Sequence, residues 1–182
     1  MKLLTAAILG ATAAATGGCM TDGASSAGNE REGTSAGADL ASASGEPIAH
    51  ADIIQVRDRL RVEIDATGLA PGVYGAHIHQ VGRCDAPGFE SAGPHWNPAG
   101  RRHGTENPQG PHLGDLPNLE VSAERRGLLI FAVEGASLQG ANPLLDADGA
   151  ALVIHAQADD NRTDPSGNSG ARIACGVIRL AG

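Results

Sequence analysis

The run from residue 60 to residue 65 alternates strictly between apolar and charged side chains: Leu60, Val62 and Ile64 are interleaved with Arg61, Glu63 and Asp65. Successive side chains of a β-strand point to opposite faces of a sheet, so alternation of this kind is typical of a strand. The run therefore predicts a strand with one face in the core and one face in water.

Comparable short runs recur along the chain, separated by turns rich in Gly and Pro, and no segment shows a convincing helical period. Only four residues are aromatic, so the core must consist of Val, Ile, Leu and Ala, a mixture that favours short strands. The 182 residues suffice for one well-packed domain. We expect an all-β sandwich or barrel over residues 37–182. Its eight strands would lie within residues 38–41, 48–56, 59–66, 73–81, 119–123, 127–133, 151–156 and 171–180.

The first 18 residues have the ordered parts of an export signal. Lys2 is followed by an apolar stretch over residues 3–15, too short to span a bilayer permanently, and by small residues that lead to Cys19. The sequence TGGC at residues 16–19 resembles a bacterial lipobox, although Thr16 stands where Leu is usual. We expect a signal peptide over residues 1–18 and a lipidated Cys19. The alternative is an ordinary signal peptide, cut nearby, that leaves Cys19 as a free thiol.

The residues after Cys19 have the composition of a flexible tether. Of the 17 residues at positions 20–36, 11 are Gly, Ala, Ser or Thr, which cannot bury enough apolar surface to order the segment. Cleavage before Cys19 removes one lysine and no acidic residue, leaving 12 basic against 21 acidic side chains and a formal net charge of −9. This charge argues against nucleic acid as a partner and against a polybasic hold on anionic lipid. Acyl chains at Cys19 would then be the membrane anchor.

The three cysteines fit the same interpretation. An exported protein with three cysteines leaves one without a partner. If Cys19 carries lipid, Cys84 and Cys175 remain to pair in an oxidising compartment. The alternative is that both are buried free thiols.

Residues 82–118 interrupt the strand pattern with seven Gly and six Pro. A segment this long without strands is usually functional or disordered, and ordering it costs about 1–2 kcal/mol of backbone entropy per residue. It contains His95, His103, His112 and Asp115, a reasonable tetrahedral set for Zn²⁺. Metal binding would supply part of the free energy that orders the segment.

A second group of histidines lies on predicted strands. His77 and His79 are two residues apart, so their side chains project from one face of a strand, roughly 6.5 Å apart. His155, at the end of an alternating run, can supply a third imidazole, and the long segment a fourth. Four nitrogen ligands in a distorted square suit Cu(II) better than Zn²⁺.

Six motifs taken together resemble the copper/zinc superoxide dismutase family in order and spacing, from about residue 37 to the C-terminus. They are GAHIHQVGRC (75–84), AGPHWNP (92–98), HG (103–104), HLGDLPNL (112–119), VIHAQADD (153–160) and GNSGARIACGVI (167–178). The resemblance implies an eight-stranded antiparallel Greek-key β-barrel or sandwich with long metal-binding and active-site loops.

The same resemblance implies a role for each matching residue. Copper would be bound by His77, His79, His95 and His155, and zinc by His95, His103, His112 and Asp115. Asp159 would link the outer ring nitrogens of His77 and His103. Arg172 would attract the anionic substrate beside copper, and Cys84 would pair with Cys175. His50 falls outside every motif and is interpreted as a histidine that binds no metal.

The implied activity is conversion of superoxide to O₂ and H₂O₂ by alternate reduction and reoxidation of copper, with His95 and Arg172 as catalytic residues. The alternative is a copper- or zinc-binding lipoprotein that buffers or delivers metal. The expected location is the periplasmic side of a bacterial cell envelope. Met20, where Asp would favour retention in the inner membrane, favours attachment to the outer membrane. Bacterial members of this family occur as monomers and as homodimers, and the sequence selects neither.

Overall fold

The computed structural model describes residues 34–182, which form nine β-strands and one turn of 3-10 helix, η1. The elements in chain order are β1 (Ser35–Ser42), β2 (Pro47–Val56), β3 (Arg59–Ala66), β4 (Gly72–Tyr74), β5 (Ala76–His79), η1 (Glu90–Ala92), β6 (Leu119–Val121), β7 (Gly127–Glu134), β8 (Ala150–His155) and β9 (Arg172–Leu180). The expected signal peptide, Cys19 and most of the expected tether lie outside the described residues. Within residues 34–182, no helix has the length and apolar character needed to cross a membrane.

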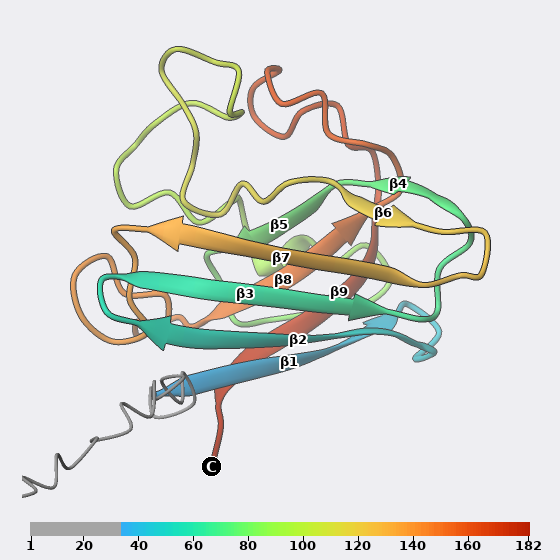
Figure 1. Cartoon of the computed structure of the whole chain (residues 1–182), viewed down its shortest axis with the longest axis horizontal. Helices are drawn as coiled ribbons and strands as arrows, with labels where there is room; N and C mark the ends of the chain where they lie inside the picture. The colour runs from blue at the N-terminus through green and yellow to red at the C-terminus, as the bar shows by residue number, and fades with distance from the viewer. Residues whose placement is uncertain (1–33) are drawn as a thin grey trace, which may run out of the picture.

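The strands form one antiparallel sheet that nearly closes into a barrel, which confirms the all-β prediction (Figure 1). Their order is β4-β6-β7-β3-β2-β1-β9-β8-β5. The strands at the two ends of this order, β4 and β5, are consecutive in the chain and are separated only by Gly75. The two edges of the sheet must therefore meet at that residue, and the sheet curls around a single core.

The expected number of strands was eight, and the structure has nine because the run over residues 73–81 divides at Gly75. Before Gly75 the chain pairs with β6, and after it the chain pairs with β8. Gly75 itself donates its N–H to the Gln157 carbonyl oxygen (2.7 Å) and accepts from the His155 N–H (2.8 Å). One continuous apolar run thus serves both edges of the barrel.

The start of the domain also differs slightly from expectation. β1 begins at Ser35, two residues before the expected boundary at 37. Ala36 is 2% exposed and pairs with Ile53 of β2 and Leu180 of β9. The last two residues assigned to the tether therefore belong to the first strand, because a small apolar side chain in this position packs into the core.

The barrel core consists of aliphatic side chains, as expected. Leu60, Val62 and Ile64 of β3 are fully buried, which confirms the inward face predicted from their alternation. All six residues of β8 are buried, so this strand is covered on both faces. On its outer face, Ala151 and Val153 belong to a second, smaller cluster of buried side chains that also includes Phe89, Ala92 and Cys175.

The segment that covers β8 is attached by a disulfide. Cys84 and Cys175 are bonded, with their Cα atoms 5.7 Å apart, which confirms the expected pairing and excludes the alternative of two free thiols. Phe89, 3% exposed, adds an apolar anchor beside the disulfide. Residues 84–93 are consequently fixed against the barrel wall.

The rest of the long connection between β5 and β6 forms no strand, as expected from its Gly and Pro content. It lies with the connection between β8 and β9 on one side of the barrel, above β4, β5 and β6 in Figure 1. Ile78 of β5 accepts a hydrogen bond from the Trp96 N–H (2.8 Å) and donates one to the Gly114 carbonyl oxygen (2.9 Å). A Cβ at position 114 would overlap the Ile78 carbonyl oxygen, so only glycine allows this close approach.

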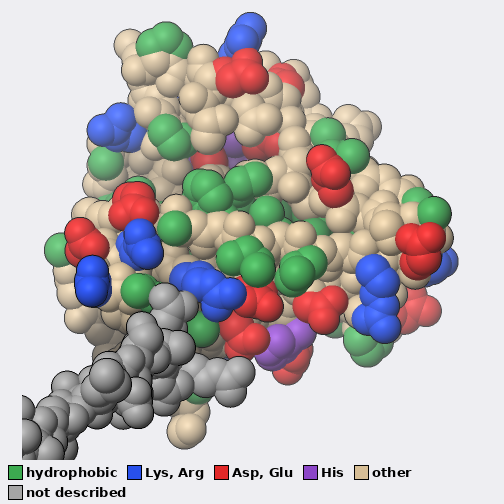
Figure 2. Space-filling view, viewed as in Figure 1, with side chains coloured by type: hydrophobic (Ala, Val, Ile, Leu, Met, Phe, Trp, Pro, Cys, Tyr) green, Lys and Arg blue, Asp and Glu red, His purple; other side chains and the backbone are tan. Residues whose placement is uncertain are grey.

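On the outer surface of β1 and β2, acidic side chains surround an exposed histidine, His50. His50 Nδ1 lies 2.7 Å from Asp39 Oδ1, and His50 Nε2 lies 3.6 Å from Asp52 Oδ1. Figure 2 shows acidic side chains gathered on this part of the surface. The structure thus places His50 on the barrel wall, outside the groups of buried histidines described below.

Candidate metal centre

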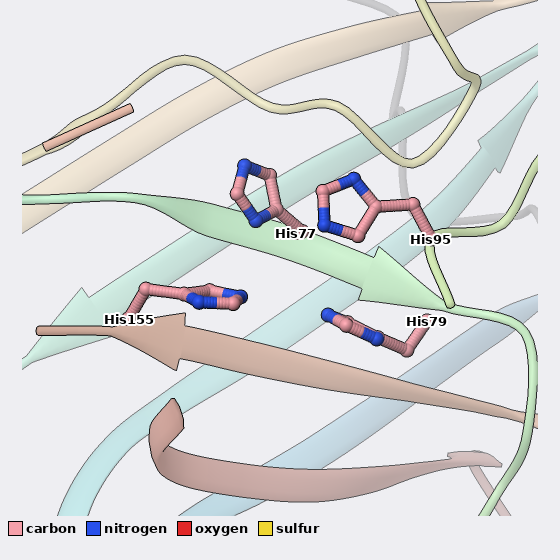
Figure 3. A group of neighbouring side chains, drawn as sticks. All are labelled: His77, His79, His95 and His155. Atoms are coloured by element: carbon pink, nitrogen blue, oxygen red, sulfur yellow. The ribbon is translucent and has the colours of Figure 1, made fainter. Parts of the chain in front are cut away.

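Four histidines converge on the outer face of the barrel wall, beside β5 and β8. His77 and His79 lie on β5, His155 ends β8, and His95 lies on the connection between β5 and β6. β5 pairs with β8, and His79 forms an isolated bridge with His95, so backbone pairing brings the four positions together. One ring nitrogen of each lies within 4.8 Å of one from every other, and all four side chains are buried. Figure 3 shows the four rings facing one shared space.

Backbone oxygens hold two of these rings from outside. His79 Nδ1 lies 2.8 Å from the Gly93 carbonyl oxygen, and His155 Nδ1 lies 3.2 Å from the Gly170 carbonyl oxygen. A carbonyl oxygen can only accept, so each Nδ1 carries the proton and Nε2 keeps its lone pair. The second nitrogen of each ring is therefore in the form that binds a cation.

Five buried ring nitrogens have no hydrogen-bond partner among the described residues: His77 Nδ1, His79 Nε2, His95 Nε2, His103 Nδ1 and His155 Nε2. Buried polar atoms in folded proteins are almost always paired, so five in one place need an explanation. Four of them belong to the histidines of Figure 3. A cation in the shared space would satisfy all four at once, and four imidazole nitrogens suit Cu(II).

A second group surrounds one oxygen of Asp115. Asp115 Oδ1 lies 2.9 Å from His95 Nδ1, 3.0 Å from His103 Nδ1 and 3.1 Å from His112 Nδ1. The approach to His103 Nδ1 does not have the geometry of a hydrogen bond. The ligands of a tetrahedral zinc ion are separated by about 3.3 Å when its bonds are about 2.0 Å long. The donor set of three nitrogens and one carboxylate oxygen fits Zn²⁺ in chemistry and in spacing.

Hydrogen bonds to the other oxygen orient the Asp115 carboxylate. Asp115 Oδ2 accepts from the backbone N–H groups of Gly104 (2.9 Å) and His112 (3.0 Å). Both donors belong to the same connection as Asp115, which is 5% exposed. The backbone therefore keeps Oδ1 directed at the three imidazoles.

His95 and Asp159 each join the two groups, in different ways. His95 is a member of both, because its Nδ1 faces Asp115 while its Nε2 is unpaired. Asp159 Oδ2 lies 2.6 Å from His77 Nε2, and Asp159 Oδ1 lies 3.0 Å from His103 Nε2. The structure thus brings together every predicted ligand and places the Asp159 carboxylate between the outer nitrogens of His77 and His103.

Electrostatics give His103 a different protonation state from His79, His95 and His155. Burial lowers the pKa of His79 to about 2 and that of His155 to about 3, so both are neutral near pH 7. Burial also lowers the pKa of His95, to about 4, against the opposing effect of Asp115. Burial disfavours a charge on His103 too, but Asp115 and Asp159 outweigh it and raise the pKa to about 9. A metal ion must therefore displace a proton from His103.

Arg172 opens β9 beside the four histidines. Its Nη1 and Nη2 donate to the carbonyl oxygens of Phe89 (2.6 Å) and Gly93 (2.7 Å), which both belong to the disulfide-anchored segment. Burial lowers the pKa of its guanidinium, and Glu90 opposes this, but an arginine remains cationic near pH 7. Its positive charge contributes to the lowered pKa values of His79 and His155, which places it close to both.

Sequence reasoning did not identify several groups that build this site. The carbonyl oxygens of Gly93 and Gly170 orient two rings, but every residue carries such an oxygen, so no residue type marks them. Asn118 lies in one of the six motifs, yet its contact with Asp159 becomes visible only in the folded chain. Gly167 approaches Asp159 so closely that a Cβ would overlap the carboxylate.

Comparison with known proteins gives consistent matches. The model of the copper/zinc superoxide dismutase (SODC) family matches residues 48–178. The chain is 46% identical over 143 residues to the superoxide dismutase-like protein YojM of Bacillus subtilis, an alignment that covers 76% of this chain and 73% of that protein. It is 40% identical over 145 residues to superoxide dismutase (Cu-Zn) 1 of Aquifex aeolicus, with 78% and 86% covered.

A solved structure also matches the fold. The crystal structure of a double mutant of a SOD-like protein from Bacillus subtilis superposes with a TM-score of 0.74 and 46% sequence identity. The match covers 78% of this chain and 95% of that chain.

Proposed function

Because the chain belongs to the copper/zinc superoxide dismutase family, we propose that it converts superoxide to O₂ and H₂O₂, using one copper and one zinc ion. The observation that carries the proposal is the set of four buried, unpaired imidazole nitrogens of His77, His79, His95 and His155. When bound there, copper supplies a one-electron redox change, so that one superoxide is oxidised to O₂ and a second, with two protons, is reduced to H₂O₂.

The residues that hold the second ion have a structural task in this proposal. Zinc has no accessible redox step, so His103, His112 and Asp115 take no part in electron transfer. They join separate parts of the strandless segment, residues 82–118, to one another and, through His95, to β5. This arrangement keeps His95 Nε2 directed at the copper ligands.

His95 is the proposed proton carrier. Its ring contributes to both ligand groups, with Nδ1 on the side of Asp115 and Nε2 on the side of the other three histidines. Nε2 of His95 would hold one of the two protons that H₂O₂ needs and would pass it to the product. An imidazole suits this task because one ring nitrogen can gain or lose a proton while the other keeps its contact.

Arg172 is the proposed anchor for the anionic substrate. The described part of the chain offers one other cation on the connection between β8 and β9, Arg162, and its Nη2 is paired with Glu106 Oε2 at 2.5 Å. Arg172 is held by backbone carbonyls, which carry no formal charge. A local positive field can guide an anion even on a protein of negative net charge.

The proposal is tested by measuring superoxide consumption by the pure protein loaded with copper and zinc, then stripped with a chelator, then reloaded. We expect activity that disappears on chelation and returns with metal, and little activity in a His95→Ala variant. A protein that binds both metals tightly without consuming superoxide would instead be a metal-buffering or metal-delivery protein, the alternative that the superoxide dismutase-like relative keeps open.

We further propose that the enzyme acts in the bacterial cell envelope, anchored through a lipid on Cys19. The support is the order of Lys2, the apolar stretch, TGGC and a tether-like composition in the sequence. Labelling with a radioactive fatty acid should mark the wild type but not a Cys19→Ser variant. Equal labelling of both, or of neither, would refute the anchor.

A further inference from the structure

Asn118 makes two hydrogen bonds to the backbone of one residue on the facing connection. Its Nδ2–H group donates to the Asp159 carbonyl oxygen (2.9 Å), and its Oδ1 accepts from the Asp159 N–H (2.8 Å). An amide side chain has one donor and one acceptor group side by side, so a single Asn118 holds both backbone polar groups of Asp159. The peptide units on both sides of Asp159 are thereby fixed.

The two residues differ in how firmly the fold holds them. Asn118 lies between Leu116 and Leu119, which are 1% and 0% exposed and belong to the barrel core. Asp159 lies on the connection between β8 and β9, where no strand supports the backbone. The hydrogen bonds therefore tie Asp159 to the rigid barrel through Asn118.

The Asp159 carboxylate is the part of this connection that contacts both groups of ligands. Its oxygens lie 2.6 Å from His77 Nε2 and 3.0 Å from His103 Nε2, and one of them also accepts from the Asn161 N–H at 2.6 Å. A backbone shift at Asp159 would move both oxygens together. Such partners of a ligating histidine set its tautomer and ring orientation.

We propose that Asn118 is a positioning residue for both metal sites: by holding the backbone of Asp159, it keeps His77 and His103 oriented for copper and zinc. The inference rests on the proposed function, since it needs both sites to take up metal. Asn118 lies beyond the ring contacts and acts only through Asp159, so its removal should weaken both sites together.

The first test measures metal affinity, not activity. Removing a direct partner of a ligating histidine typically costs 10–100-fold in affinity, and Asn118 acts one contact further away. We therefore expect Asn118→Ala to weaken copper and zinc binding by about 3- to 10-fold each, measured by competition with chromophoric chelators. Unchanged affinity for both metals, or loss confined to one, would overturn the proposal.

The second test separates positioning from general stabilisation. Asp159→Asn removes the carboxylate but leaves the backbone groups that Asn118 holds. If Asn118 acts through Asp159, adding Asn118→Ala to Asp159→Asn should cause little further loss of affinity, because coupled residues are not additive. An equal further loss in both backgrounds would show that Asn118 merely stabilises the fold.

Two more variants complete the design. Asn97 makes the same pair of hydrogen bonds, to the Arg101 carbonyl oxygen (2.8 Å) and from the Arg101 N–H (2.9 Å), but in an exposed turn. Asn97→Ala should therefore leave the affinities for copper and zinc near their wild-type values.

Asn118→Asp keeps the side-chain acceptor and loses the side-chain donor. It should therefore lose less metal affinity than Asn118→Ala, and it replaces that variant in the test if the alanine variant does not fold. If Asn118→Asp and Asn118→Ala both bind copper and zinc with wild-type affinity, the proposal is wrong.

The same titrations distinguish the two levels of inference. A wild-type protein that takes up neither metal would refute the proposed function and, with it, the positioning role. A wild-type protein that binds both metals and consumes superoxide, beside an Asn118→Ala variant of equal affinity, would refute only the role of Asn118.

Discussion

The carbonyl oxygen of Gly93 connects two side chains with different tasks. It accepts from Arg172 Nη2 at 2.7 Å and lies 2.8 Å from His79 Nδ1. The guanidinium that we propose as substrate anchor is thus fixed by the same atom that sets the tautomer of a proposed copper ligand. Cys84 and Phe89 hold this segment against β8 and β9, so the position of the charge follows from the packing of the barrel wall.

Substitution of Arg172 tests the proposed anchor. Arg172→Ala should slow superoxide consumption by about tenfold and weaken its dependence on ionic strength, because electrostatic guidance contributes about 10- to 1000-fold to such rates. Metal content should stay intact, since Arg172 is not among the predicted ligands. Stopped-flow or pulse-radiolysis rates at several salt concentrations provide the measurement.

The Arg172→Lys variant is the matched control for charge. It keeps a cation but loses the two-pronged contact with the carbonyl oxygens of Phe89 and Gly93. It should retain more salt dependence than the alanine variant. Kinetics of the alanine variant equal to wild type at low salt would contradict the anchoring role.

Acid should destabilise the metal-free protein through its buried neutral histidines. The folded-state pKa values of His79 and His155 are about 2 and about 3, below the ordinary 6.5, so between these limits the unfolded chain binds more protons. The contribution of these two histidines to the free energy of unfolding is therefore complete above pH 6.5 and decreases as the pH falls. The loss is about 2 kcal/mol for each histidine between pH 6.5 and 4.5.

Urea unfolding of the chelator-treated protein across this range measures the effect. The pKa of His103 is raised to about 9, so this residue makes the folded state less stable as the pH rises. That effect is confined to the interval from pH 6.5 to 9, outside the range of the measurement. His50→Gln is a suitable control because the hydrogen bond with Asp39 outweighs burial at this exposed residue and raises its pKa. Stability of the metal-free protein that does not change between pH 6.5 and 4.5 would disprove the burial argument.

Around the site, the connections between strands bring backbone atoms into close contact with side chains. The connection between β8 and β9 places Gly167 against Asp159, where a Cβ would overlap the carboxylate and lie 2.7 Å from His103 Nε2. Gly167 also has φ of +63°, which glycine adopts without strain. The backbone itself therefore covers the carboxylate and excludes water from its contacts with His77 and His103.

Substitution at Gly167 tests whether this contact matters for metal binding. Gly167→Ala should displace Asp159 and lower zinc and copper affinity by about 10-fold or more, the range expected when a partner of a ligating histidine is disturbed. Gly100→Ala is the matched control, because Gly100 has φ of +61° but no atom within 4 Å of the position that an alanine Cβ would take. Chelator competition on both variants measures the difference, and equal losses would attribute the effect to backbone strain alone.

At the scale of the whole molecule, closure of the sheet brings the ligands together. β4 and β5 meet at Gly75, and the connection after β5 then folds back onto the free edge of that strand. The two long connections lie on the same side of the barrel (Figure 1). Contacts between them include the hydrogen bond from the Glu106 N–H to the Asn161 carbonyl oxygen (2.9 Å).

Removal of both metals should loosen this side of the molecule and leave the barrel intact. A ligand present at a thousandfold excess over its Kd stabilises the folded state by about 4 kcal/mol, so chelation should lower Tm by roughly 10 °C or more. Hydrogen exchange should become faster in residues 95–118 and 156–171. Strands β1, β2 and β3 should keep their protection, and uniform acceleration over the whole domain would contradict the separation of barrel and site.

The class of fold and the chemistry of the predicted ligands can both be read from the amino-acid sequence. Alternation at Leu60, Val62 and Ile64 fixes which face of a strand is buried, because the side-chain period of a strand is a local property. Likewise, His77 and His79 must share a face because they are two residues apart. The order and spacing of the motifs then predict that the long strandless segment binds metal.

The division of the run over residues 73–81, and the choice of the backbone atoms that hold the rings, depend on how the chain folds. Both depend on residues far apart in the chain: Gly75 pairs with Gln157, and Asn118 holds Asp159. A local pattern contains no information about such partners, since carbonyl oxygens and amide groups are present throughout the sequence. Closure of the sheet brings them within hydrogen-bond distance, so the orientation of the ligands, unlike their identity, is a property of the folded barrel.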